Sequence, residues 1–109
     1  MYANEKRISV AINTSTSGDN EIIAAPGAGK QLYIDYLQLN PNGGGQTLII
    51  KSASTEKCRW VLDDNQALTM EDSIHDPEGV ITCAVNEAFN VNLSASTQVT
   101  GYVKYRIRE

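Results

Sequence analysis

The chain has 109 residues, of which 41% are hydrophobic and 20% charged, which is enough apolar content for one domain with its own core and too much for a disordered chain. Its net charge of −4 argues against nucleic-acid binding, because neutralising phosphates requires a concentrated basic surface. No apolar run approaches the ~18 residues needed to span a bilayer, and residues 1–10 lack the apolar core of a signal peptide. We therefore expect a single domain over residues 1–109 that is made without crossing a membrane.

Short runs in which apolar and polar residues alternate recur along the chain, separated by turn residues. A period of two is typical of half-buried β-strands. The expected strands are residues 7–12, 21–25, 30–39, 46–52, 57–62, 80–83, 89–95 and 99–108, with 66–70 either a short strand or one helical turn. This pattern predicts an all-β fold: a jelly-roll-like two-sheet β-sandwich of about eight short antiparallel strands, with a small barrel as the alternative.

The run over residues 30–39 differs from the others because both of its faces are apolar. One face carries Leu32, Ile34 and Tyr36, and the other carries Tyr33, Leu37 and Leu39. A strand that is apolar on both faces needs a cover on each of them.

The segment after this run contains the strongest break in the chain. Residues 40–45 read Asn-Pro-Asn-Gly-Gly-Gly, which predicts a hairpin loop because the glycines allow positive φ angles. The later run over residues 57–62 places Cys58, Trp60 and Leu62 on its inner side, with Trp60 as the largest piece of core.

The clearest alternation lies at residues 99–108. There, Val99, Val103, Tyr105 and Ile107 alternate with Thr100, Lys104, Arg106 and Arg108. We expect the three cations on one face to form a solvated strand surface or a charged edge that resists strand pairing. A docking site for an acidic partner is the alternative.

The sequence offers little support for enzyme chemistry. Residues 27–30, Gly-Ala-Gly-Lys, lack the Ser or Thr and the following helix of a phosphate-binding loop, so they predict a plain turn. His75 is the only histidine, and the sequence contains no nucleophile motif such as Gly-x-Ser-x-Gly. We expect no enzyme activity, no catalytic site and no cofactor.

The acidic residues between positions 63 and 78 predict a solvated rim and no metal site. If an ion does bind there, its first ligands would be Asp63, Asp64 and Asp72. We expect Cys58 and Cys83 to be reduced thiols, with a disulfide as the alternative.

Four tyrosines are of a residue type found both in sugar-binding sites and in subunit interfaces: Tyr33, Tyr36, Tyr102 and Tyr105. In a sugar site, Asn90 and Asn92 would be their polar neighbours. An interface is the favoured reading, because an apolar ring and a polar tip both find partners there.

Four segments together resemble a family of small phage and prophage proteins, which are short jelly-roll-like β domains encoded among virion structural genes. The segments are residues 21–30, 32–39, 86–94 and 101–105, and the resemblance extends over residues 7–107. It implies a capsid decoration (cement) protein located in the virion after synthesis in the host cytoplasm. The implied partners are two further copies, in a homotrimer, and the major capsid protein or another virion protein. A carbohydrate- or receptor-binding module of a tail fibre or baseplate is the nearest rival.

Two regions are the expected contacts with other subunits or the capsid. Residues 1–6 form a flexible or partner-binding arm, and one face of residues 30–39 meets a neighbouring subunit. The candidate interface residues are Tyr2, Asn4, Lys6, Arg7, Tyr33, Leu37 and Leu39.

Overall fold

The computed structural model describes residues 6–71 and 79–109, and every regular element in these ranges is a β-strand. The strands are β1 (Ile8–Thr14), β2 (Gly18–Ile23), β3 (Gln31–Asn42), β4 (Gln46–Ser52), β5 (Thr55–Leu62), β6 (Leu68–Glu71), β7 (Ile81–Thr82), β8 (Phe89–Leu93) and β9 (Gln98–Arg108). The all-β prediction is confirmed, and the range 66–70 contains a strand and no helical turn, since β6 spans Leu68–Glu71. The described residues contain no helix that could cross a membrane.

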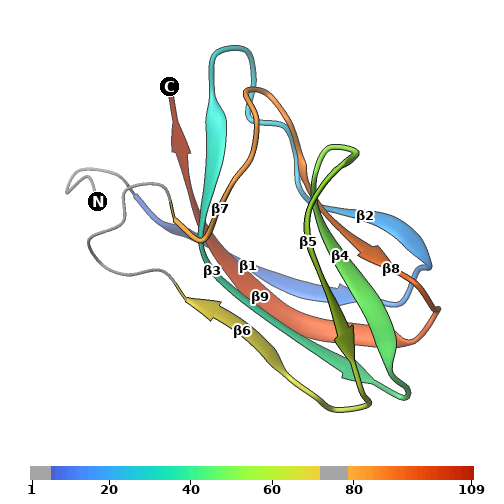
Figure 1. Ribbon diagram of the computed structural model, residues 1–109. Coiled ribbons are helices and arrows are strands. Elements are labelled where there is room, and N and C mark those ends of the chain that lie inside the picture. The colour runs from blue at the N-terminus through green and yellow to red at the C-terminus, as the bar shows by residue number, and fades with distance from the viewer. Residues whose placement is uncertain (1–5, 72–78) are drawn as a thin grey trace.

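The strands form two antiparallel sheets that pack as a sandwich (Figure 1). One sheet has five strands in the order β1-β9-β3-β6, with β7 also paired to β3; the other has four, in the order β2-β8-β4-β5. Most connections cross from one sheet to the other, which is jelly-roll topology. The predicted fold is therefore confirmed.

The core lies between the inner faces of the two sheets. Fully buried side chains come from β3, β4, β8 and β9, including Leu32, Leu48, Phe89, Val91 and Val103. Burying one side chain of this size is worth about 1.5–3 kcal/mol. The alternation of β4 and β8 is regular because one face of each strand meets this core and the other meets solvent.

A β-bulge in β3 corrects the prediction that its two faces are both apolar. Ile34 pairs with Tyr105 and Tyr36 pairs with Lys104, which leaves Asp35 as the extra residue. One inserted residue switches all later side chains to the opposite face. As a result Leu32, Ile34, Leu37 and Leu39 all point into the core and are fully buried.

The hairpin predicted at residues 40–45 was wrong, because this segment carries the chain from one sheet to the other. β3 continues through Pro41, which lies opposite Val99, and β4 then begins in the four-stranded sheet. Gly43 and Gly44 have positive φ angles, and both of their N–H groups donate to Asp64 Oδ1, at 2.9 and 3.2 Å. Asp64 thereby stabilises the crossing.

Residues 27–30 form the expected turn. The Lys30 N–H donates to the Gly27 carbonyl at 3.1 Å, and β3 begins at the next residue. Cys58 and Cys83 are unpaired, as expected. Burial raises the pKa of both thiols.

Candidate interaction surfaces

Strand β5 is the most exposed strand of the sandwich, and it carries two large apolar side chains. It pairs with β4 on one side and has no strand of the described residues on the other. Trp60 lies opposite the buried Leu48, so its side chain is on the inner face, as predicted. It is nevertheless 40% exposed, because the sheet ends at β5, and the prediction of a buried core residue was wrong. Val61, on the outer face, is 77% exposed.

Charges and a bulge protect the backbone of β5 from pairing with another strand. Cys58 pairs with Ile50 and Glu56 pairs with Lys51, so Lys57 is an extra residue that bends the edge. Arg59 donates to the Glu56 carboxylate through Nε at 2.8 Å and Nη2 at 2.5 Å. Bulges and cations of this kind are typical of edges that resist strand addition. We name residues 56–61 the β5 edge. This edge therefore offers a partner its side chains rather than its backbone hydrogen-bonding groups.

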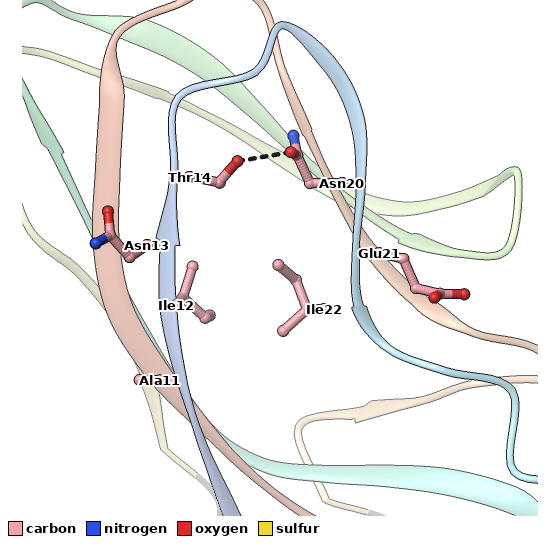
Figure 2. Close-up of a pocket in the computed structure, with 7 residues that line it drawn as sticks. All are labelled: Ala11, Ile12, Asn13, Thr14, Asn20, Glu21 and Ile22. Atoms are coloured by element: carbon pink, nitrogen blue, oxygen red, sulfur yellow. Dashed lines mark hydrogen bonds between the residues drawn. The ribbon is translucent and has the colours of Figure 1, made fainter.

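The opposite side of the sandwich contains a hollow of about 270 Å³ between the edge strands β1 and β2. Figure 2 shows Ile12 and Ile22 facing each other across it, while Asn13 and Glu21 point away. At one end the Thr14 hydroxyl donates to Asn20 Oδ1 at 2.6 Å, and Asn20 Nδ2 donates to the Thr16 carbonyl at 2.8 Å. These polar groups are satisfied within the chain. The exposed lining of the hollow is mainly polar, because Ile12 is only 2% exposed.

Two tyrosines form a stacked pair on the outer face of the five-stranded sheet. The rings of Tyr36 and Tyr102 are 5.0 Å apart at an interplanar angle of 22°, and Lys104 Nζ lies 6.0 and 5.9 Å from their centroids. A hydrogen bond with the Tyr102 side chain raises the pKa of Tyr36. This pair is the only part of the predicted tyrosine group that the described structure brings into ring contact.

The remaining members of the predicted sugar-site group are dispersed. Tyr33 lies near Arg106 and Arg108, and Tyr105 packs against the core. Asn90 and Asn92 are on β8 in the other sheet, where they donate to the Ala53 carbonyl and to Asp19. A sugar site built from all six residues is therefore excluded by the fold.

A buried ion cluster forms around the bulge residue Asp35, which is 3% exposed. Arg106 donates to both carboxylate oxygens, through Nε at 2.8 Å and Nη2 at 2.7 Å. Arg7 Nε donates to the same carboxylate at 3.1 Å. Arg106 is 0% exposed, so the predicted solvated face or charged edge was wrong at this position. Moreover, β9 is a central strand between β1 and β3.

The structure separates the residues predicted to form an interface. Tyr2 and Asn4 lie outside the described residues, Lys6 is exposed, and Arg7 is bound to Asp35. Tyr33 is half-buried on the outer face, beneath the Arg106 and Arg108 guanidinium groups. The bulge in β3 places Leu37 and Leu39 in the chain's own core, where they cannot contact a partner while this fold is intact.

The acidic region contributes no assembled metal site in the part of the chain that the structure describes. No group of three or more His, Cys, Asp or Glu side chains converges within residues 6–71 and 79–109. Asp63 and Asp64 are exposed, and Asp64 accepts hydrogen bonds from the glycine turn. Asp72 and His75 lie outside the described residues.

The β5 edge and the hollow between β1 and β2 were both missed from the sequence. The mixture of Glu56, Lys57 and Arg59 within one strand was the available signal that β5 is an edge.

The sequence matches no protein-family model, and a search of curated proteins found no match.

Proposed function

We propose that this protein is a structural subunit of a phage particle: a capsid decoration protein that binds the head lattice as a homotrimer and stabilises it. The observation that carries the proposal is the exposed Trp60 and Val61 on the β5 edge. Trp60 and Val61 lie on opposite faces of this edge strand, and exposed aromatic side chains such as Trp60 are enriched where other proteins bind. In this proposal the protein works through binding, and no residue performs a reaction.

The fold and the sequence resemblance support the same proposal. Jelly rolls are one of the architectures of viral capsid domains, although they also occur in lectins. The resemblance to small virion proteins rests on segments that form β2, β3, β8 and β9 here. Because a fold alone does not determine function, the exposed edge remains the specific argument.

Stabilisation of a capsid by such a protein follows from mass action. A subunit that binds only the assembled lattice lowers its free energy by RT ln(1 + [L]/Kd), which is about 2.7 kcal/mol at a free concentration of 100 times Kd. A trimer adds avidity, because three linked contacts must open before it is released. Modest contacts per copy are therefore sufficient.

Binding to capsids tests the proposal directly. Empty capsids assembled from the major capsid protein encoded with this chain are mixed with it and sedimented. We expect saturable co-sedimentation and a rise in the temperature at which the capsids disrupt. Capsids that bind none of the protein at micromolar concentration would contradict the decoration role.

A second candidate, a carbohydrate- or receptor-binding module of a tail fibre or baseplate, is favoured by the Tyr36 and Tyr102 pair beside Lys104. The matched variant is Tyr102→Ala, which removes one ring from the outer face of the five-stranded sheet. Under the decoration proposal this variant binds capsids like the unaltered protein. Sugar-dependent binding to host cells that Tyr102→Ala abolishes would favour the second candidate instead.

A further inference from the structure

The crossing from β3 to β4 contains the one Asn-Gly pair in the sequence, Asn42-Gly43. An asparagine followed by glycine is prone to lose its side-chain amide, because glycine has no side chain to keep the following backbone nitrogen away from the asparagine Cγ atom. Gly43 is exposed, and a Cβ atom built there would meet nothing within 4 Å. Access of solvent and the lack of crowding therefore favour this reaction at Asn42.

Two hydrogen bonds hold the groups that would react. The Asn42 Nδ2 group donates to Thr100 Oγ1 at 3.1 Å, across the pairing of β3 with β9. The Gly43 N–H donates to Asp64 Oδ1 at 2.9 Å. This nitrogen must lose its proton before it can attack a carbon atom, and a negative charge on it is disfavoured beside a carboxylate. Asp64 therefore opposes the first step of the reaction.

Asp64 is held at the crossing by other contacts of the loop between β5 and β6. The loop lies beside the end of β3 (Figure 1), where the Asn65 N–H donates to the Pro41 carbonyl at 2.8 Å. The Asp64 oxygen that binds Gly43 also accepts a hydrogen bond from the Gly44 N–H at 3.2 Å. The carboxylate is therefore fixed at the Gly43 nitrogen by the backbone on both sides.

We propose that Asn42 is a site of spontaneous modification, at which the side-chain amide becomes a carboxylate, and that Asp64 sets the rate by holding the Gly43 N–H. In the first step the Gly43 nitrogen gives its proton to water or hydroxide and bonds to Asn42 Cγ. The Cγ–Nδ2 bond breaks, and Nδ2 takes a proton from solvent and leaves as ammonia. Water then opens the cyclic imide at either of its carbonyl carbons. The product is aspartate or isoaspartate, with one water consumed for each ammonia released.

The modification weakens the connection between the two sheets. A carboxylate at position 42 cannot donate to Thr100, and it adds a second negative charge near Asp64. In isoaspartate the main chain runs through the side-chain carbon, which lengthens it by one atom. β3 pairs with β9 as far as Asn42, opposite Gln98, so the extra atom lies where the strand ends and the crossing begins. Because the ammonia is lost to solvent, the change accumulates with the age of the protein.

Peptide mass spectrometry of the purified protein, incubated at neutral pH for a series of times, tests the proposal. Trypsin releases residues 31–51, in which Asn40 is the only other asparagine, and the proline after it has no N–H to lose. Asp64→Ala should raise the rate of conversion at Asn42 about tenfold, the factor that corresponds to one hydrogen bond to a charged group. Asp64→Asn, which keeps an oxygen acceptor without the charge, should give an intermediate rate.

Asp63→Ala is the matched control, because Asp63 is an exposed carboxylate of the same loop that binds neither Gly43 nor Gly44. It should convert at the rate of the unaltered protein, and unaltered protein unfolded in urea should convert faster than the folded form. Circular dichroism confirms that each variant is folded, and Asp64→Asn carries the comparison if Asp64→Ala is not. Folded Asp64 variants that convert no faster than the unaltered protein would overturn the role of Asp64. No conversion at Asn42 even in urea would overturn the modification itself.

Discussion

Replacing Gly101 with alanine is expected to lower the free energy of unfolding by at least about 4 kcal/mol, which is a larger loss of stability than most single substitutions cause. Gly101 lies in β9, between Ile12 of β1 and Leu39 of β3. A Cβ atom at this position would collide with the Gln38 carbonyl oxygen and lie 2.7 Å from the carbonyl carbon. Because hydrogen-bonded strands flank β9 on both sides, the backbone cannot move away without breaking a ladder.

Urea denaturation followed by circular dichroism measures this effect. Gly29→Ala is the matched control, since Gly29 also has a positive φ, of 77°, but a Cβ atom there would meet nothing within 4 Å. It should cost about 1–2 kcal/mol, the range for a non-glycine residue in this conformation. Equal losses for the two variants would show that the close approach of β9 and β3 does not exist as described.

Asp35→Ala is expected to destabilise the fold by about 3–5 kcal/mol, because it removes the buried carboxylate that accepts two hydrogen bonds from the buried Arg106 guanidinium. Removing one partner of a buried pair costs more than the net value of the pair, since the remaining charge stays out of water and loses a main source of compensation. Arg7→Ala is the control. Arg7 is 36% exposed and contributes one hydrogen bond to Asp35, so its loss should cost about 1 kcal/mol or less.

A double variant separates the ion pair from a general packing defect. Arg106→Leu in the Asp35→Ala background removes the buried guanidinium charge, so the double variant should be more stable than Asp35→Ala alone. Chemical denaturation of the single and double variants gives the comparison. A double variant whose loss equals the sum of the two single losses would indicate that Asp35 and Arg106 act independently.

The strands were predictable because alternation is a local property of the sequence. The predicted range 46–52 coincides with β4, and every other expected strand overlaps an observed one. The bulge at Asp35 was not predictable in the same way. It is stabilised by Arg106, which is 71 positions away, and that pairing exists only once β3 lies beside β9. The alternation of apolar and polar residues also fails to reveal the inserted residue, because Tyr33 and Tyr36 count as apolar whichever face of the strand they are assigned to.

Trp60 is exposed because of the order of the strands in the sheet, and strand order cannot be read from a local sequence pattern. The side chain does point toward the inner face, as alternation predicts, but β5 is the last strand of its sheet. The hollow is likewise a product of topology, since β1 and β2 belong to different sheets and meet only at their edges. Both candidate surfaces therefore arise from long-range arrangement, and sequence patterns placed the interface instead on Leu37 and Leu39.

The most direct test of self-assembly is the absolute mass of the purified protein, measured by size-exclusion chromatography with light scattering over a series of dilutions. The proposed assembly predicts a trimer of three times 11.9 kDa that persists into the low micromolar range. A mass of 11.9 kDa at every concentration would contradict it, because no copy of the protein would then cover Trp60 and Val61 of another in solution.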